Sequence, residues 1–292
     1  MKALVCISQG VGNVVMATPL VQAVHDLGYA VDVYCDARCN AASLLRGWAA
    51  VEHVFTSWGD LSLLQAHYDV ICRGSWCRLR WPPAFLQSRD YLSPDILDMR
   101  VYHETAVNMT VAHKLGYAGP TPPAHCEADE PGVALPQEYT AICPGYGSER
   151  SPQWDRKLWP HWRNLCNALA DCGTHLVCVG SSLDTHLGEL PVDVDLRGLL
   201  SLRASAGVLA GAERVIAIDN GLAHVAAALG VETAVLFGFT SPLKNRPLGR
   251  GVRVLTAGLD CQPCQLRGQE QTCVDAQCMR QLSAGKVLEG IA

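Results

Sequence analysis

Residues 215–242 read VIAIDNGLAHVAAALGVETAVLFGFTSP, and this stretch decides the fold class. Its first residues, Val215–Ile218, form a short apolar run typical of a buried parallel strand. The polar cluster Asp219–Gly221 suits a tight turn and can cap the helix expected over 222–229. A second strand is expected over 233–237. The stretch therefore predicts strand, turn, helix and strand, the repeating unit of an α/β protein.

Two loops of this stretch, residues 219–221 and 238–242, follow neighbouring strands and so reach the same edge of the predicted sheet. The first loop opens a helix, whose free N–H groups and positive dipole end attract phosphate. The alternative is a purely structural role, in which Asn220-Gly221 is an ordinary turn and His224 is a hydrogen-bonded histidine of the helix. The pattern alone supports phosphate binding and a plain turn about equally.

The full string resembles the signature of glycosyltransferase family 9, the ADP-heptose:lipopolysaccharide heptosyltransferases. In that family an Asp-Thr-Gly-Leu-x-His run precedes an Ala-rich helix and a Phe-Gly-x-Thr-x-Pro loop. The residues that match it here are Asp219, Gly221, Leu222, His224, Phe237, Gly238, Thr240 and Pro242. Asn220 stands where the family usually has Thr, which is a small polar change.

The composition is that of a soluble protein with a large core. The chain has 292 residues, 49% hydrophobic and 17% charged, and this length suits two domains. The net charge of −5 argues against a nucleic-acid-binding protein. The first residues, MKALVCI, predict a strand and no signal peptide, and no apolar stretch has the length of a membrane span. We expect a cytoplasmic protein with at most peripheral membrane contact.

Four of the fourteen cysteines cluster near the C-terminus with the spacing C-x2-C-x8-C-x4-C. They are Cys261, Cys264, Cys273 and Cys278. In a reducing compartment four thiolates favour a tetrahedral metal site, which is structural because it leaves no open coordination position. Two disulfides, or reduced thiols that fix a loop, are the alternatives. The resemblance to family 9 adds that a related branch, the protein heptosyltransferases, binds iron at this place. A structural zinc or iron is therefore expected.

Strands and helices alternate in both halves of the chain. In the first half, strands are expected over 3–7, 30–35, 51–55 and 70–72, and helices over 14–27, 41–46 and 102–115. In the second half, strands over 139–143 and 175–180 precede the opening stretch, and helices are expected over 160–172, 202–210 and 281–291. The proline-rich, acidic segment from about 119 to 136 predicts a linker and hinge.

These patterns predict an N-terminal domain at 1–128 and a C-terminal domain at 137–292, each with a doubly wound parallel sheet. The resemblance to family 9 is strongest over 1–35 and 139–292 and weak over 56–100. It implies an α/β, GT-B-like fold, in which two doubly wound Rossmann-type domains face each other across a cleft. The first domain then takes the acceptor, and the second takes the nucleotide-sugar donor.

Residues 10–24, GVGNVVMATPLVQAV, resemble a glycine-rich turn of family 9. Gly10 and Gly12 allow the main chain to turn closely beneath a ligand on the acceptor side. The family's Asp at this turn is the proposed general base that deprotonates the acceptor hydroxyl. This chain has Asn13 there, and an amide cannot take up that proton.

Three explanations of Asn13 remain open. Another group acts as the base, and His103 and Glu104 are the nearest candidates by family position. Alternatively, the acceptor needs little help from a base. In the third explanation, the protein binds a nucleotide sugar without transferring it.

The loop 144–148 leads to Lys157-Leu158-Trp159-Pro160, which resembles the family's Pro-Gly loop followed by Lys-x-Trp-Pro. The resemblance implies that Lys157 neutralises the diphosphate as it leaves, whereas a lone lysine is otherwise a solvated surface group. Asp184 lies near the position of the family's ribose-binding acidic residue. Three tryptophans are expected to pack rather than to form a sugar platform: Trp154, Trp159 and Trp162.

The resemblance implies an inverting, metal-independent glycosyltransferase that needs no cofactor for catalysis. It moves a sugar, expected to be a heptose, from an ADP-linked donor to a hydroxyl of a glycan, lipid-linked or protein acceptor, as in lipopolysaccharide biosynthesis. The diphosphate is held by the main chain of 220–223, with His224, Lys157, Gly238 and Thr240. The rival is a nucleotide-sugar-binding protein with lost or marginal transferase activity. A weaker alternative is an epimerase of the same architecture.

Overall fold

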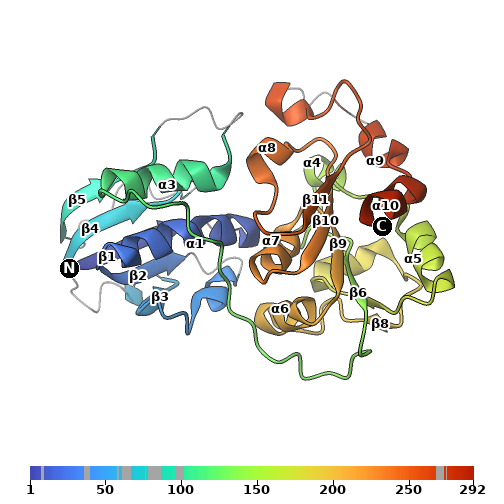
Figure 1. Ribbon diagram of the computed structural model, residues 1–292, viewed down its shortest axis with the longest axis horizontal. Coiled ribbons are helices and arrows are strands. Elements are labelled where there is room, and N and C mark those ends of the chain that lie inside the picture. The colour runs from blue at the N-terminus through green and yellow to red at the C-terminus, as the bar shows by residue number, and fades with distance from the viewer. Residues whose placement is uncertain are drawn as a thin grey trace. The chain divides into compact units, whose positions relative to one another are not determined.

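The computed structural model describes residues 1–7, 10–35, 40–57, 59–60, 67–75, 77, 87–95, 102–267, 273 and 275–292. They form two compact units, Met1–Glu127 and Ala128–Ala292 (Figure 1). Each unit has its own sheet and its own buried core. In the described parts of the chain, no helix is both long and apolar enough to cross a membrane.

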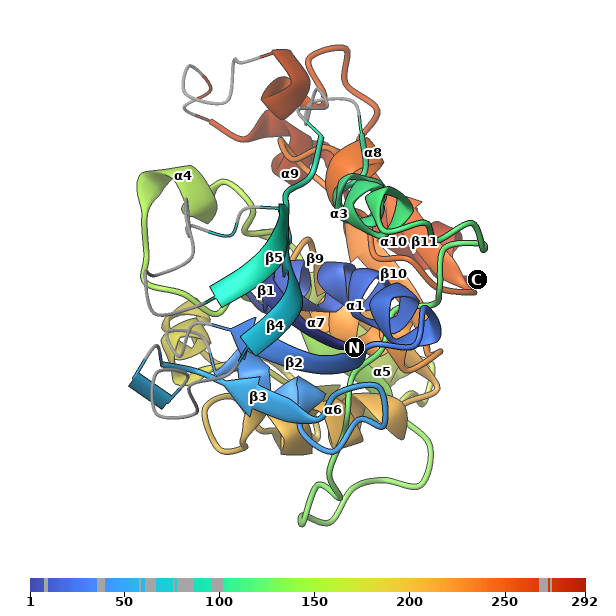
Figure 2. The same cartoon turned by 90° about the vertical axis from the view of Figure 1, so that its left-hand side faces the viewer.

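The described strands of the first unit form one parallel sheet in the order β3-β2-β1-β4-β5, which Figure 2 shows fanning out from β5 to β3. They are β1 (Lys2–Ile7), β2 (Ala30–Cys35), β3 (His53–Phe55), β4 (His67–Arg73) and β5 (Gln87–Leu92). In the register, Val5 of β1 lies opposite Val33 of β2 and Cys72 of β4. The central strand β1 is buried from Ala3 to Ile7, as expected of a strand covered on both faces.

The described helices of this unit are α1 (Val11–Asp26), the 3₁₀ helix η2 (Ala41–Leu45) and α3 (Glu104–Lys114). Helix α1 begins three residues before the predicted start, so Pro19 lies in its interior. Proline has no N–H for the carbonyl of Val15. The hydroxyl of Thr18 donates to that carbonyl instead, at 2.7 Å, so this buried oxygen keeps a partner. Apolar residues of α1 and α3 pack in one core with β1 and β2.

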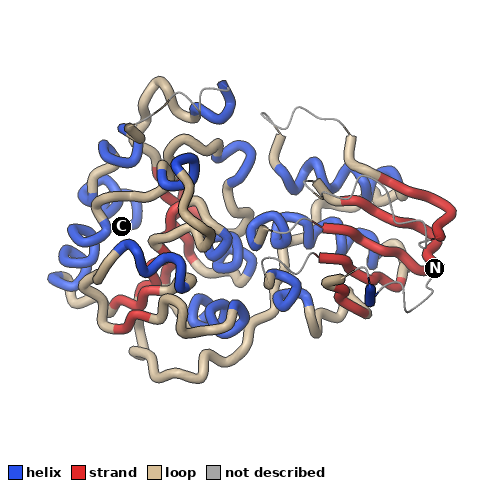
Figure 3. Tube along the Cα trace, turned by 180° about the vertical axis from the view of Figure 1, so that it is seen from behind, coloured by secondary structure: helices blue, strands red, loops and turns tan. Residues whose placement is uncertain are grey.

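The second unit contains a parallel sheet whose described strands follow the order β11-β10-β9-β6-β7-β8. Its strands, red in Figure 3, are β6 (Thr140–Cys143), β7 (Leu176–Cys178), β8 (Val194–Asp195), β9 (Arg214–Ile218), β10 (Glu232–Leu236) and β11 (Val252–Leu255). Strand β9 is central, with Ala217 opposite both Cys143 of β6 and Val235 of β10. The opening stretch of the sequence thus supplies two neighbouring inner strands, as predicted.

The described helices of the second unit are α4 (Pro152–Asp155), α5 (Trp162–Asp171), η3 (Ser182–Leu187), α6 (Leu202–Ala210), α7 (Gly221–Ala228), α8 (Pro242–Asn245), η4 (Cys264–Arg267), α9 (Gln277–Gln281) and α10 (Ala284–Ile291). The single helix predicted over 281–291 is wrong at its start. Ser283 caps α10 by accepting from the N–H of Lys286, so α9 and α10 are separate. Helix α4 lies between the predicted loop 144–148 and Lys157, where no helix was predicted, and Ser151 caps it.

The strand order of each sheet reverses beside its first strand: between β1 and β4 in the first unit, and between β6 and β9 in the second. At such a point the connections leave the sheet in opposite directions. Ligands of doubly wound proteins bind there, outside the carboxyl ends of the strands. The loops after β1 and β4, and those after β6 and β9, are therefore where each unit offers a ligand site.

The proline-rich segment is anchored to both units near its middle. In the first unit, the N–H of His125 donates to Thr18 Oγ1 at 2.9 Å, and the N–H of Glu127 donates to the oxygen of Leu44 at 2.8 Å. In the second unit, the N–H of Asp129 donates to the oxygen of Arg203 at 3.1 Å. The stretch between these anchors is therefore short, and its role as a hinge stays a prediction.

Candidate functional site

The loops after β6 and β9 are tied together by Asn220, the N-cap of α7. Its Oδ1 accepts from the N–H of Ala223 at 2.9 Å. Its Nδ2 donates to the main-chain oxygens of Cys143 and Gly145, at 3.2 and 2.7 Å. A threonine hydroxyl has a single proton and could not replace both of these donated bonds. Asn220 therefore caps the helix and also fixes the loop after β6 against it.

Lys157 reaches the loop after β9 and forms an ion pair with Asp219. The Nζ atom lies 2.9 Å from Asp219 Oδ2 and donates to the main-chain oxygen of Asp219 at 3.0 Å. The two side chains are only 15% and 6% exposed, so Lys157 is not a solvated surface lysine. Its charge is thus held beside the positive end of α7, where an anionic ligand can share it with Asp219.

Two buried hydroxyls in the loop after β10 add to this site. Thr240 and Ser241 are 1% and 0% exposed, and no group among the described residues hydrogen-bonds to Thr240 Oγ1 or Ser241 Oγ. A buried polar group without a partner costs about 1–3 kcal/mol. Ligand oxygens bound at this loop would remove that cost. Sequence reasoning named Thr240 but missed Ser241, although it lies directly before Pro242 at the start of α8.

Trp154 differs from the other two tryptophans of its segment. Trp159 and Trp162 are buried and pack edge to face, as predicted. Trp154, on α4, is 36% exposed, and Lys157 Nζ lies 4.9 Å from the centroid of its ring. The expectation that all three tryptophans pack is therefore met only in part, because Trp154 is the exposed one of the three. The spacing of Trp154 from Lys157, one helical turn, was the signal that could have shown it.

Phe239 joins this aromatic group from the loop after β10. Its ring centroid lies 6.3 Å from that of Trp154, and the guanidinium carbon of Arg156 lies 4.9 Å from it. Lys157 and Arg156 therefore each lie over an aromatic ring, beside the loops that carry Asp219 and Thr240. Sequence reasoning did not single out Arg156.

Asp184, expected to contact a ribose, is 3% exposed and bonded to its own loops. Its Oδ1 accepts from the N–H of Gly147, and its Oδ2 accepts from the N–H and hydroxyl of Ser181. A Cβ on Gly145 would overlap this carboxylate. Asp184 thus fastens the loop after β6 to the loop after β7, and its contact with a ribose stays a prediction.

The remaining predicted donor residues lie at the same edge of the second sheet. Gly221, Leu222 and Ala223 form the first turn of α7, followed by His224, which is 4% exposed. Gly238 lies in the loop after β10, where an added Cβ would overlap the sulfur of Met279 on α9. The loop after β10 therefore packs directly on α9, which carries one of the four clustered cysteines.

The cysteine-rich segment braces the loop after β10 through hydrogen bonds. The side chain of Gln262 donates to the oxygens of Phe237 and Gly238, at 3.2 and 3.0 Å. Gln265 completes the brace: its N–H donates to the oxygen of Phe239 and its Oε1 accepts from the N–H of Ser241. The order of this segment therefore bears on the geometry of the loop after β10.

The four thiols share one neighbourhood. Burial raises the pKa of Cys264, and the nearby Cys261 and Cys273 raise it further. Burial likewise raises the pKa of Cys278 to about 11, and the other three thiols add to that shift. By their chemistry, four soft donors in one segment suit a zinc or iron ion. Among the described residues, however, these sulfurs do not form a group whose ligand atoms all lie within 4.8 Å of one another, so the metal site stays a prediction.

In the first unit the structure brings Asn13 and Glu104 together. Asn13 lies in the first turn of α1, and its Nδ2 donates to both carboxylate oxygens of Glu104, at 2.8 Å each. His103 is the N-cap of α3, where its Nδ1 accepts from the N–H of Thr105 at 3.1 Å. Gly10 is the N-cap of α1, and Gly12 lies beside Asn13 in the first turn.

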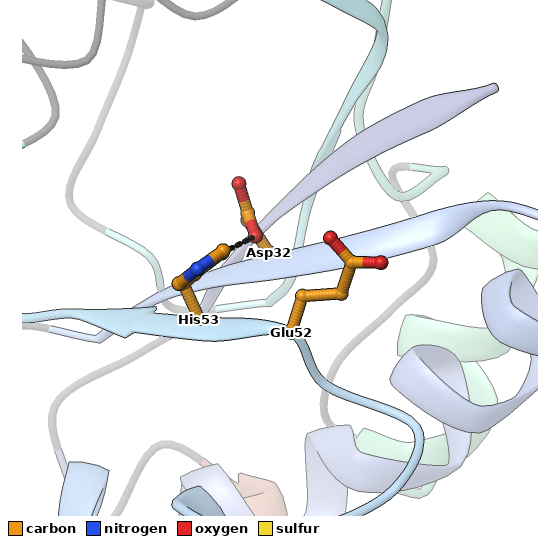
Figure 4. Close-up of side chains that lie close together, drawn as sticks. All are labelled: Asp32, Glu52 and His53. Atoms are coloured by element: carbon orange, nitrogen blue, oxygen red, sulfur yellow. Dashed lines mark hydrogen bonds and ion pairs between the residues drawn. The ribbon is translucent and has the colours of Figure 1, made fainter.

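A second cluster in the first unit consists of Asp32, Glu52 and His53, whose ligand atoms lie within 4.8 Å of one another (Figure 4). Asp32 is fully buried and already has partners. Lys2 Nζ lies 2.9 Å from its Oδ2, His53 Nδ1 lies 2.9 Å from its Oδ1, and Tyr68 donates its hydroxyl at 2.8 Å. Internal bonds account for this carboxylate, so the cluster serves the packing of β2 against β3.

Comparison with known proteins identifies the family of this chain. The family model of glycosyltransferase family 9 (heptosyltransferase) matches residues 94–274, which include the Lys157–Asp219 pair and three of the four clustered cysteines. The chain belongs to glycosyltransferase family 9. The resemblance read from the opening stretch is thereby confirmed.

Curated relatives of this family 9 protein include two lipopolysaccharide heptosyltransferases 1. That of Pseudomonas aeruginosa is 36% identical over 118 residues, covering 38% of this chain and 33% of the relative. That of Escherichia coli K12 is 36% identical over 95 residues, covering 30% of each chain. The chain spans about a third of the length of the curated relatives it matches.

Solved structures resemble this family 9 protein over its whole length. E. coli ADP-heptose lipopolysaccharide heptosyltransferase II has a TM-score of 0.75 at 20% identity, covering 100% of this chain and 97% of its own. E. coli heptosyltransferase WaaC with ADP has a TM-score of 0.69 at 19% identity, covering 99% and 98%. The iron-containing dodecameric glycosyltransferase TibC of enterotoxigenic E. coli has a TM-score of 0.69 at 14% identity, covering 99% and 74%. With the parallel sheet of each unit, these similarities confirm the α/β, GT-B-like fold class.

Proposed function

We propose that this protein is an inverting, metal-independent heptosyltransferase that uses ADP-heptose as donor and a hydroxyl of a lipopolysaccharide-type glycan as acceptor. The observation that carries the proposal is the second unit's anion site. There Lys157, the N-terminus of α7 and two unpartnered buried hydroxyls converge on the loops after β9 and β10. Family membership gives this site its expected substrate, since relatives are named as heptosyltransferases and one solved relative holds ADP.

In the proposed reaction the second unit holds the diphosphate of the donor. The main chain of 220–223 points at one phosphate the N–H groups that the Asn220 cap leaves unused, and Lys157 supplies a positive charge as the nucleotide leaves. The hydroxyls of Thr240 and Ser241 donate to the phosphate oxygens. Because Lys157 supplies this charge, the leaving diphosphate can be stabilised without a divalent cation. Inversion follows from a single displacement by the acceptor hydroxyl.

We further propose that the cysteine cluster holds a structural zinc or iron when the protein is loaded with metal. The ligands are Cys261, Cys264, Cys273 and Cys278. A metal with four thiolate ligands supplies cross-linking and no open position for substrate. Its effect on the donor site would pass through Gln262 and Gln265, whose bonds hold the loop after β10. Cytoplasmic location likewise stays a prediction.

Calorimetry against ADP, UDP and GDP tests the donor site. We expect ADP to bind with the highest affinity and Lys157→Ala to weaken ADP at least tenfold, because a buried charge-assisted contact to phosphate is lost. Lys286→Ala is the matched control, since Lys286 is an exposed lysine of the same unit. Failure of all three nucleotides to bind at millimolar concentration would overturn the assignment of the donor site.

Transfer is tested separately, by ADP release from ADP-heptose in the presence of lipopolysaccharide from a strain that adds no heptose. The expected product carries the added mass of one heptose. ADP binding without acceptor-dependent ADP release would instead favour a nucleotide-sugar-binding protein that has lost transfer. The amide of Asn13 is the feature that favours this second function, since an amide cannot serve as a base.

A further inference from the structure

We propose that Glu104 is the general base of the first unit and that Asn13 positions it. The inference rests on the proposed transfer function. The observation behind it is a contact between two elements far apart in the chain. The amide of Asn13 donates to both oxygens of a carboxylate that is 1% exposed and belongs to α3.

The pair lies where a doubly wound sheet places its ligands. Asn13 belongs to the first turn of α1, which follows β1, and β1 borders the point where the strand order reverses. Ser75, in the loop after β4, lies on the other side of that point and bonds to Asn108 of α3. The first turn of α3, which carries Glu104, is thereby held at the carboxyl ends of β1 and β4.

The bond pattern fits the ionised form of the carboxyl group. An ionised carboxylate has only acceptors, and both oxygens of Glu104 accept from the same amide nitrogen. The ionised form is also the one that can take up a proton. Asn13 therefore stabilises the ionised carboxylate of Glu104 by donating hydrogen bonds to it. An Asp at this position would instead place two negative charges in contact.

Buried polar contacts fix the helix that carries Glu104. Thr105 Oγ1 and Asn108 Nδ2 both donate to the oxygen of Met16 in α1, at 3.0 and 3.3 Å. Asn108 Oδ1 accepts from the N–H and the hydroxyl of Ser75, at 2.7 Å each. A base held by such neighbours loses little conformational freedom when the acceptor binds. Such fixed positioning of the base favours general-base catalysis.

Gly10 makes the position of Asn13 possible. A Cβ at residue 10 would overlap the Oδ1 atom of Asn13, and the three atoms nearest to it all belong to Asn13. The missing side chain therefore leaves room for the amide to face Glu104. The other candidate base is placed differently: His103 uses its Nδ1 to cap α3 and so serves the helix end.

The proposed step balances as follows. The acceptor hydroxyl gives its proton to Glu104, while its oxygen forms a bond to the anomeric carbon of the sugar. The bond from that carbon to the diphosphate oxygen breaks, and ADP leaves with the electron pair. Because the carboxylate is buried, bulk water has little access to the base, which favours the acceptor over hydrolysis of the donor.

The test exchanges the two side chains. Glu104→Gln should lower acceptor-dependent release of ADP from ADP-heptose by at least a hundredfold, the usual contribution of a general base, with ADP affinity unchanged. Asn13→Asp combined with Glu104→Gln returns a carboxylate to the same pair and should recover most of the lost rate. Glu52→Gln, a change of an exposed glutamate in the same unit, is the control.

Two outcomes overturn the proposal. A Glu104→Gln variant within threefold of the unchanged protein shows that Glu104 only joins α1 to α3. An exchanged variant that is stably folded, by its melting temperature, but as slow as Glu104→Gln shows that the carboxylate does not act through this pair. If the unchanged protein binds ADP but releases none from ADP-heptose, the transfer function fails first and the inference falls with it.

Discussion

At the scale of single residues, the exposed indole of Trp154 is a feature of the proposed donor site. Lys157 belongs to the proposed donor site, and its Nζ lies 4.9 Å from the Trp154 ring centroid. A cation over an aromatic face gains about 0.5–1 kcal/mol at exposed sites. The ring therefore restrains the lysine without neutralising it.

Trp154→Ala should accordingly weaken ADP binding about two- to fivefold and leave the melting temperature nearly unchanged, because the ring is already 36% exposed. Trp154→Phe should retain most of the affinity. Calorimetry and thermal unfolding measure both. Trp162→Ala is the contrasting variant, since removal of this buried ring should lower the melting temperature. Equal ADP affinity in Trp154→Ala and the unchanged protein would contradict the role of the ring.

At the scale of elements, helix α7 depends on a cap that also ties two loops together. Asn220 makes three bonds, one to the N–H of Ala223 and two to the loop after β6. Loss of an N-cap costs about 1 kcal/mol, and loss of buried hydrogen bonds adds to this. The same bonds hold the N–H groups of α7 toward the expected phosphate.

We expect Asn220→Ala to lower the melting temperature by several degrees and to weaken ADP binding about tenfold or more. Asn220→Thr keeps the cap but not both donated bonds, so its melting temperature should lie between those of the unchanged protein and Asn220→Ala. Thermal unfolding with and without ADP separates the contributions. Asn164→Ala, at a helical asparagine of α5 whose side chain is exposed, is the matched control. An Asn220→Thr variant as unstable as Asn220→Ala would show that the cap contributes nothing.

At the scale of the whole molecule, the C-terminal cysteine segment is bonded to the loop after β10, which belongs to the proposed donor site of its unit. Its glutamines bond to the loop after β10, and Arg156 donates to the oxygen of Cys273 at 3.0 Å. A metal at the four thiols would therefore order two neighbours of the phosphate, the loop with Thr240 and the segment with Lys157. Metal loading and donor affinity should be linked.

Protein purified without chelator should carry about one zinc or iron per chain by elemental analysis. Removal of the metal should lower the melting temperature and weaken ADP binding severalfold, and its return should restore both. Cys264→Ser should reproduce the loss. Cys172→Ser, at an exposed cysteine outside the cluster, should not. Metal-free protein with full stability and full ADP affinity would contradict the proposed support.

Sequence patterns located most elements because local chemistry decides them. The strand of 30–35 and the helix of 202–210 were predicted with the bounds that the structure has, since an apolar run and a Ser cap mark them. Strand β5 and helix α4 were missed. The segment of β5 is polar, and α4 is a single turn stabilised by its Ser151 cap and by the bonds of Asp155 to Tyr146 and Arg150.

By itself the sequence determined the fold class and the family and located the loops after β9 and β10, because strand periodicity, helix caps and the motif around Asp219 are local properties of the chain. Only the tertiary structure decided which residues far apart in the sequence form pairs. Lys157 meets Asp219 across 62 positions, and Asn13 meets Glu104 across 91. Such contacts depend on which strands lie side by side, and no local pattern encodes that. The three open explanations of Asn13 therefore became one proposal only when Glu104 was found against its amide.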